Sequence, residues 1–407
     1  MDIHYKNRKM INAIYFYIIL TALPLLLENY SFNTFLTPGS SLYSMYINLL
    51  YLLLPIILLK VNNFELTINK NQVFLIVILL ILSLISFFFG LQIYTDYKLF
   101  INTILLSVGV FTIICLSNSF ILSEEELNLF MVKMLHFVIF ACLYNVIINI
   151  DLLLFGSSTL HVKRQFASFF SNKNTFGILL VIGIIVCTYL YMLNKKSKFF
   201  FVFLFFILNL IWTESTNSLI SVIIFLATFF FMFYKINYIK RTLIIFAGVS
   251  ISFFLLRSNF FEGVVNFMRF GDISELSGRT NLWLAGLKVF SENIIFGIGL
   301  GHSPRILSNS GYENDQFHNG YIEILVSGGI VLFIIYFLLA SIFIYKLRIL
   351  RLKNNLMGSI YLAGFLSLLF STFFESLLLF RGGYFSGIIT LFYIFMPLTL
   401  INSIKRL

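Results

Sequence analysis

Charged side chains are scarce in this chain: Asp, Glu, Lys and Arg make up only 11% of its 407 residues, whereas 59% are hydrophobic. Soluble globular proteins carry about 25% charged and about 45–50% apolar residues. The shortage of charge therefore excludes a soluble enzyme, a nucleic-acid-binding domain and a disordered protein. The composition indicates an integral membrane protein that crosses the bilayer many times.

Cysteine is also rare. The three cysteines, Cys115, Cys142 and Cys187, lie far apart in separate apolar runs, which fits neither a disulfide framework nor a zinc site. We expect them to be thiols in the protein core. The five histidines form no HExxH pattern and no pair at helical spacing, so the sequence predicts neither a metal site nor a cofactor.

Long apolar runs follow one another along the chain. A bilayer core about 30 Å thick needs about 20 apolar residues per helix, and about twelve runs approach this length. They are 11–27, 43–59, 72–91, 99–117, 128–150, 173–193, 199–213, 217–234, 242–257, 319–345, 356–377 and 384–402. We therefore predict an all-α, polytopic membrane protein whose residues 1–407 form a single transmembrane domain.

Basic residues are unevenly distributed between the two sides of this predicted membrane domain. With an even number of spans both termini lie on one side, and most of the 28 Lys and Arg residues fall in the loops and tails of that side. This is the positive-inside pattern, so we expect both termini in the cytoplasm. The pattern also explains the net charge of +11 without a nucleic-acid partner. The first run follows Lys6, Arg8 and Lys9 like a signal peptide but lacks a small-residue cleavage site, so we expect a retained anchor.

Ionisable residues near the membrane gather at the outer ends of the predicted spans. They are Lys173, Glu214, Glu323, Glu375 and Arg381. Charged groups are costly in a membrane and tend to be functional. An ion-coupled transporter is expected to place such groups at the bilayer midplane, so this distribution favours chemistry at the outer face.

One outer loop, 258–317 between the ninth and tenth runs, is far longer than most of the others, and long loops in compact proteins are usually functional. Apolar spacing predicts a helix within it, for which Ser277 is a suitable N-cap. Arg279 would then lie in the first helical turn, where the backbone N–H groups and the dipole favour a bound anion. The alternative is an ion pair between Arg279 and Asp272 or Glu275.

Three other segments are candidates for the functional site or for the structure that supports it. The glycine-containing run 296–301 lacks the preceding strand of a nucleotide-binding loop, so it predicts a tight turn. His318 stands where the chain re-enters the membrane, and an imidazole there can act as a general base for a hydroxyl, unless it is an interfacial histidine with no role. In the smaller outer loop, 151–172, the position of Arg164 opposes the positive-inside pattern and favours a role in anion binding. The same holds for Lys173, which directly follows this loop. The alternative for Lys173 is snorkelling of its side chain toward the membrane surface.

Motifs in this order resemble the O-antigen polymerase and O-antigen ligase family of bacterial surface polysaccharide assembly. They are Arg164–Asn174, Gly278–Trp283 with Phe296–Gly299, and His318–Glu323 with Gly328 and Gly329. No single motif is specific, but their order, spacing and outer location are. With the span pattern, the resemblance covers roughly residues 130–345.

The resemblance implies a GT-C-like helical fold and a metal-independent, lipid-linked glycosyltransferase in the bacterial inner membrane. Its donor and acceptor glycans are carried by undecaprenyl diphosphate. Arg279 and Arg164 are then expected to contact the diphosphate or the glycan, with His318 as the base. Further substrate contacts are expected at Lys173, Asn319, Tyr321 and Glu323. Membrane lipid, a chain-length regulator and a flippase are the expected partners.

One departure from the family pattern bears on the acceptor. Ligases of this family appear to need an arginine in the stretch that matches Thr213–Ser218, where this chain has a neutral residue, Thr216 or Asn217 depending on register. This favours a polysaccharide polymerase over a ligase that uses lipid A–core as acceptor. A lipid-linked oligosaccharide flippase is the alternative of another class, but it would need a polar central cavity and no catalytic loop.

The charge distribution predicts the topology of the chain. A single cysteine introduced near Asn309 should react with a membrane-impermeant maleimide in intact cells, and one introduced at either terminus or in 346–355 should react only after the membrane is disrupted. Native Cys115, Cys142 and Cys187 are replaced by serine beforehand. Protection of the Asn309 position in intact cells would contradict an outer active site.

Overall fold

The computed structural model describes a set of helices that includes the segments singled out above, apart from the one that holds Arg164. The residues described are 3–28, 53, 56–63, 81, 84, 88, 120, 122–150, 166–170, 172–234, 279–299, 303–312 and 316–376. The helices are α1 (Ile3–Glu28), α5 (Glu124–Ile148), α7 (Lys173–Asn194), α8 (Ser197–Trp212), α9 (Thr216–Phe233), α12 (Arg279–Glu292), α13 (Ser303–Asn309), α14 (Gly320–Lys353) and α15 (Asn355–Ser371). No strand occurs among these residues, in agreement with the predicted all-α class.

Four of the described helices, α5, α7, α9 and α14, are long and apolar enough to cross a membrane, and α8 and α15 are shorter apolar helices. Together with α1 they coincide with seven of the predicted runs. The runs 43–59, 72–91, 99–117, 242–257 and 384–402 lie wholly or largely outside the described residues. The total of about twelve spans and the GT-C-like arrangement therefore stay predictions.

Helix α7 lies at the centre of the described bundle, where it packs against α5, α8, α9 and α15. It is apolar around its whole circumference, as expected of a helix without a solvent-facing side. Close packing depends on Gly183, because a Cβ there would lie 2.6 Å from Val138 Cγ1 of α5 and 3.1 Å from the ring of Phe206 of α8. Cys142 and Cys187 are buried free thiols, as predicted.

Polar side chains also join the helices inside the bundle. Asn145 of α5 donates through Nδ2 to Asn209 of α8 at 3.0 Å, and its side-chain oxygen Oδ1 accepts from the backbone N–H of Ser168 at 3.0 Å. The Ser168 hydroxyl donates to Ala141 O at 2.6 Å. Interhelical hydrogen bonds of this kind stabilise helix association in an apolar environment. They fix the turn 166–170 against α5, and this turn leads into α7.

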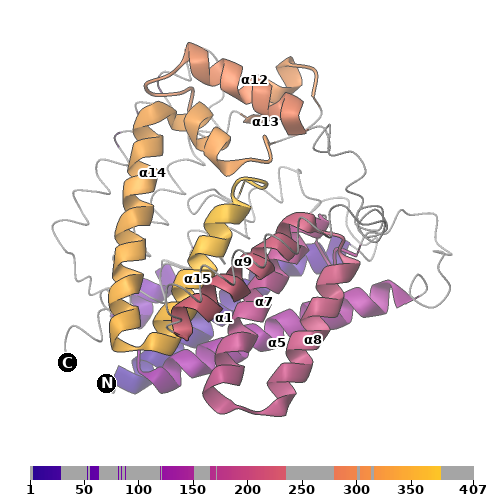
Figure 1. The fold of residues 1–407 in the computed structure, drawn as a ribbon, viewed down its shortest axis with the longest axis vertical. Helices are drawn as coiled ribbons and strands as arrows, with labels where there is room; N and C mark the ends of the chain where they lie inside the picture. The colour runs from indigo at the N-terminus through magenta and orange to yellow at the C-terminus, as the bar shows by residue number, and fades with distance from the viewer. Residues whose placement is uncertain are drawn as a thin grey trace.

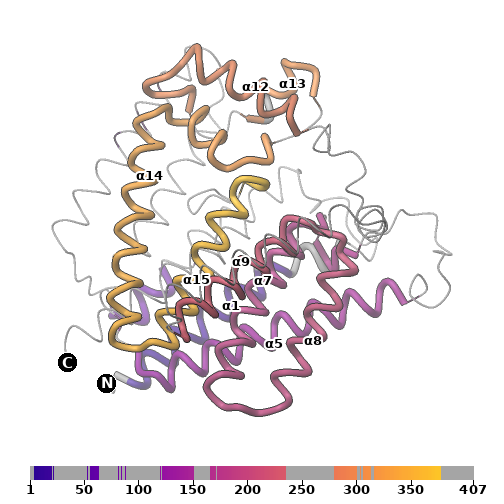
Figure 2. Tube along the Cα trace, viewed as in Figure 1, coloured from indigo at the N-terminus to yellow at the C-terminus, as the bar shows by residue number. Residues whose placement is uncertain are grey.

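The segments predicted to lie on opposite sides of the membrane are at opposite ends of the bundle (Figure 1). At one end Asn7 of α1 donates to Glu126 at 2.9 Å, and Asn354 donates to Glu124 at 3.0 Å. Helix α14 continues through most of the predicted loop 346–355, so that only Asn354 separates it from α15. At the other end α12 and α13 cover the beginning of α14, and we call these two helices the cap (Figure 2).

Helix α14 is interrupted near its beginning, at Gly329, where φ is 63° and ψ is −165°. The interruption leaves backbone groups without hydrogen-bond partners inside the helix, and the segment that follows α12 supplies the missing partners. Ile298 N donates to Val326 O at 2.9 Å, Gly299 N donates to Ser327 O at 2.8 Å, and Ile330 N donates to Ile294 O at 2.8 Å. Backbone hydrogen bonds thus fasten the cap to both halves of α14.

Glycines allow this close approach of two backbones. A Cβ on Gly297, whose φ is +63°, would lie 2.4 Å from Val326 O, and a Cβ on Gly329 would lie 2.2 Å from Ile295 O. Gly299 also has a positive φ, of 97°. The described part of 296–301 is therefore a tight turn, as predicted, and its glycines serve contact with α14.

Replacing Gly329 should weaken the attachment of the cap. Gly329→Ala introduces both a left-handed alanine, which costs about 1–3 kcal/mol, and a clash with the Ile295 carbonyl group. We expect the thermal unfolding midpoint of the detergent-solubilised protein to fall by several degrees. Gly311→Ala is the matched control, because Gly311 also has a positive φ, of 81°, but has nothing within 4 Å of the added Cβ. Equal midpoints for the two variants would contradict the proposed backbone contact.

Candidate functional site

Helix α12 places Arg279 over the bundle. Its apolar face is the one predicted from sequence: Leu282 and Gly286 are buried, and Ala285, Val289 and Phe290 pack against the same cluster. A Cβ on Gly286 would lie 2.6 Å from Ile322 of α14, so the glycine sets how near the two helices come. Arg279 is the first residue of α12, in the first turn as expected, whereas Ser277 lies outside the described residues.

The chain reaches α14 through a segment that holds His318 in a defined place. Phe317 is fully buried beneath α12. Asn319 caps α14, its side-chain oxygen accepting from the N–H groups of Tyr321 at 3.0 Å and Ile322 at 3.1 Å. Between them His318 has a φ of 51°. Residues other than glycine that adopt this left-handed conformation occur preferentially at functional sites, since the strain must be offset by the surrounding structure.

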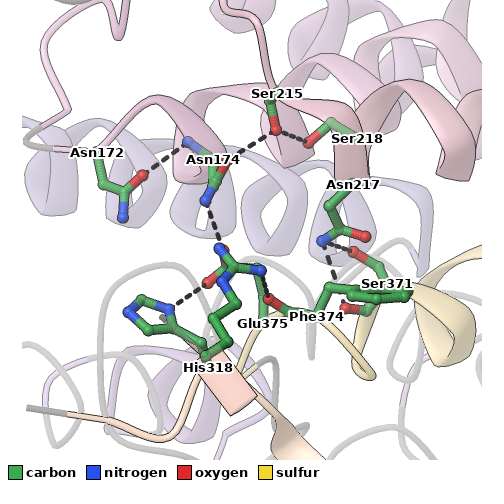
Figure 3. Close-up of polar contacts among 10 residues, drawn as sticks. Asn172, Asn174, Ser215, Asn217, Ser218, His318, Ser371, Phe374 and Glu375 are labelled. Carbon is green, nitrogen blue, oxygen red and sulfur yellow. Dashed lines mark hydrogen bonds and ion pairs between the residues drawn. The ribbon is translucent and has the colours of Figure 1, made fainter. Parts of the chain in front are cut away.

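Glu375, four residues after the end of α15, lies at the centre of the polar contacts in Figure 3. Its Oε1 atom lies 3.2 Å from Arg279 Nη2 and accepts from Asn174 Nδ2 at 2.6 Å. Its Oε2 atom lies 3.3 Å from His318 Nδ1. Arg279 also donates through Nη1 to Phe374 O at 2.6 Å. One carboxylate thus joins α7, α12, the segment before α14 and the segment after α15.

The three charged or titratable side chains of this cluster are largely enclosed by protein. The exposed fractions of the side chains are 18% for Arg279, 16% for His318 and 8% for Glu375. Coulomb interactions in such surroundings are several-fold stronger than in bulk water. The arrangement can therefore hold an anion beside the guanidinium and orient the imidazole, which are the two tasks that the sequence analysis assigned to Arg279 and His318.

The beginning of α9 borders this cluster. The Ser215 hydroxyl donates to Asn174 Oδ1 at 2.9 Å and is also 2.9 Å from the Ser218 hydroxyl. Lys173 Nζ lies 3.8 Å from Glu214 Oε2. Lys173, a predicted substrate contact, directly precedes Asn174, which donates a hydrogen bond to Glu375. Lys173 thus lies at the edge of the same cluster.

A second buried carboxylate, Glu323, is linked to the first through Ser376. Glu323 of α14 is 3% exposed and accepts hydrogen bonds from the hydroxyl groups of Ser303 and Ser376. Since Ser376 follows Glu375 directly, the two carboxylates are connected through adjacent residues. Glu323 also connects the cap, through Ser303 at the start of α13, to the site.

The other predicted site residues have varied surroundings. The hydroxyl of Tyr321 donates to Leu369 O at 2.6 Å, and its ring packs against Tyr336 and Phe337. The side-chain oxygen of Asn319 is engaged in capping α14. Arg164 lies outside the described residues, so its role stays a prediction. Within the described ranges, no group of three or more His, Cys, Asp and Glu side chains is placed to hold a metal ion.

Sequence reasoning found two members of the cluster and missed two. Glu375 was noticed only as one of several charges at outer span ends, and Asn174 only as part of a motif. The available signal was a carboxylate at a span end on the side predicted to carry the chemistry. That signal did not distinguish Glu375 from Glu214, which the structure places beside Lys173.

Comparison with known proteins adds one finding. Residues 200–337 match the family model of the O-antigen ligase. The matched region runs from α8 to the first half of α14, so it contains Arg279 and His318, whereas Asn174 and Glu375 lie outside it. No curated protein matches the chain.

The family match overlaps two of the motifs on which the resemblance rests, at 278–299 and 318–329. It thereby supports an integral membrane protein related to enzymes that act on lipid-linked glycans. The similarity of residues 200–337 to the O-antigen ligase family supports the resemblance that the motifs indicate.

Proposed function

We propose that the protein is a polysaccharide polymerase. It transfers a growing glycan from undecaprenyl diphosphate to a hydroxyl group of a second lipid-linked repeat unit, at the outer face of the bacterial inner membrane. The observation that carries the proposal is the meeting of Arg279 and His318 at one enclosed carboxylate, at the end of the bundle that bears the cap. In this arrangement both termini are cytoplasmic, and a flippase and a chain-length regulator are the expected partners.

The reaction requires removal of a proton from the acceptor hydroxyl. The Nδ1 atom of His318 faces Glu375, so Nε2 is the nitrogen that can accept this proton. The acceptor oxygen then forms a bond to the anomeric carbon of the donor glycan. The bond between that carbon and the diphosphate oxygen breaks, and its electron pair leaves with undecaprenyl diphosphate. General base catalysis of this kind contributes about 10²–10⁴-fold to rate.

Negative charge grows on the diphosphate as it leaves, and Arg279 is suited to stabilise it. A guanidinium group has five N–H donors, and the contacts with Phe374 and Glu375 use two of its nitrogens. The planar donor group can form paired, charge-assisted hydrogen bonds with phosphate oxygens. No step in this scheme uses a metal ion, and Arg164 and Lys173 supply further positive charge on the same side.

The stretch Thr213–Ser218 favours a polymerase over a ligase. Thr216 or Asn217 stands where the family pattern has the arginine, and Asn217 of α9 donates to the Ser371 hydroxyl of α15 at 2.8 Å. Its position is thus used for an uncharged interhelical contact. A ligase that transfers the glycan to lipid A–core is the second candidate, favoured by the description of the matched family.

Glycan analysis separates the two candidates in cells. A strain that lacks a polymerase should retain single repeat units attached to the acceptor, because the ligase still works. A strain that lacks a ligase should show none attached, while lipid-linked polymer accumulates. If deletion of the gene leaves no glycan attached and lipid-linked polymer accumulates, and a plasmid copy of the gene restores attachment, the protein is a ligase and the polymerase proposal is wrong.

Loss of the guanidinium group should abolish polymer synthesis. We expect Arg279→Ala to reduce the rate of the purified protein by about 10²–10³-fold. Arg279→Lys should recover only part of the rate, because an ammonium group keeps the charge but not the planar pair of donors. Lys288→Ala on the exposed side of α12 is the control. Full activity of Arg279→Ala at normal protein level would reduce Arg279 to a structural ion pair.

Removing the imidazole should stop the chemical step and leave donor binding. His318→Ala should be about 10²–10⁴-fold slower yet bind donor lipid with nearly the parent affinity, since binding depends on the basic residues. His136→Ala, an exposed position of α5, is the control, and EDTA should not affect the parent enzyme. A His318→Ala rate within a few-fold of the parent, or inhibition by EDTA, would contradict the metal-free base mechanism.

A further inference from the structure

We infer that Glu375 is a positioning residue that selects the tautomer of His318 and couples donor binding to proton removal. The inference rests on the proposed function. It concerns a residue outside the matched family region, and it begins from the unequal use of the two carboxylate oxygens.

The two oxygens of Glu375 have different partners. Oε1 is shared by two donors, Nη2 of Arg279 and Nδ2 of Asn174, whereas Oε2 faces Nδ1 of His318. A buried carboxylate needs such partners, because enclosing an unpaired charge is costly. Asn174 is in turn fixed by the Ser215 hydroxyl on its side-chain oxygen, so its amide group must present its N–H to Glu375.

This arrangement determines where the His318 proton lies. A carboxylate oxygen only accepts hydrogen bonds, so Nδ1 must carry the hydrogen when it faces Glu375 Oε2. In the neutral ring the other nitrogen, Nε2, then has a lone pair and can act as the base. The left-handed backbone at His318 brings the ring to this position. Once Nε2 has taken up the acceptor proton, the carboxylate stabilises the resulting imidazolium.

Arg279 connects this tautomer control to the donor. In the resting arrangement Glu375 shares its charge between the guanidinium and the imidazole, at 3.2 and 3.3 Å. A bound diphosphate competes for Arg279, which draws the guanidinium away from the carboxylate. The charge of Glu375 then acts more strongly on His318, and an opposite charge nearby favours the protonated ring. The base therefore becomes stronger when the donor is in place.

Neighbouring charges do not replace Glu375 in this role. Glu323 is directed toward Ser303 and Ser376, and Glu214 lies beside Lys173. Within the described residues, Glu375 is the acid whose carboxylate contacts both Arg279 and His318.

The substitution Glu375→Gln gives a sharp test. The amide oxygen is required at the Oε1 position, where Arg279 and Asn174 both donate, so the new NH₂ group must face His318 Nδ1. An N–H donor there forces Nδ1 to accept and moves the ring proton to Nε2, which disables the base. We expect kcat to fall by about 10²–10⁴-fold, with the KM for donor changed only a few-fold. Glu375→Asp keeps an acceptor-only group and should recover part of kcat.

The tautomer can be observed without any substrate. In protein labelled with ¹⁵N-histidine there are five histidines, and the signals missing from His318→Ala identify His318. The parent and Glu375→Asp should show a protonated Nδ1 and an unprotonated Nε2, whereas Glu375→Gln should show the reverse. Glu292→Gln, at an exposed acid of α12, is the control for both measurements, and thermal unfolding midpoints confirm that the variants are folded.

The outcomes separate this inference from the function on which it rests. An unchanged tautomer in folded Glu375→Gln, or a kcat within a few-fold of the parent, would overturn the positioning role. A tautomer that reverses in Glu375→Gln supports the role even when the parent enzyme makes no polymer from lipid-linked repeat units. Failure of the parent enzyme to make polymer would instead overturn the polymerase proposal.

Discussion

The carboxylate of Glu375 connects parts of the chain that are far apart in sequence. It contacts Asn174, which is 201 residues away in sequence, and Arg279, which is 96 residues away. The first lies at the start of a central helix, and the second lies at the start of a helix in the cap. Because a buried negative charge must be compensated by positive charge and by donors, these segments are drawn to one point. The candidate site is the set of groups that this compensation brings together.

A second constraint sets the height and angle of the cap above the bundle. The break of α14 at Gly329 leaves backbone groups without partners in the helix, and the backbone of residues 294–299 supplies partners for them. Gly297 and Gly329 have no Cβ, which permits that approach. The end of α12 is thereby fixed to α14, and its beginning, with Arg279, is held over the end of α15. The break in α14 thus helps to position Arg279 through backbone hydrogen bonds.

The helices themselves were largely predictable. Apolar runs of about 20 residues predict membrane helices because an unpaired backbone group in lipid is too costly, and α5, α7, α9 and α14 lie where those runs are. The face of α12 that carries Leu282 and Gly286 follows from apolar spacing alone. The tight turn at 296–299 was also predicted from its glycines, although its backbone contact with α14 was not. The extension of α14 to Lys353 was missed, because basic residues near a span end resemble a loop.

The site shows where sequence reasoning reaches its limit. Residue type and location at a span end made Arg279 and His318 candidates, since guanidinium groups bind phosphates and imidazoles transfer protons. The sequence by itself thus predicted an all-helical membrane protein in which a guanidinium group and an imidazole group are candidates for one site. Only the tertiary structure decided that Glu375 joins them and that Asn174 shares its oxygen, because both contacts depend on how α7, α12 and α15 pack. Which of several span-end acids meets the arginine is a property of that packing, and no local pattern in the chain records it.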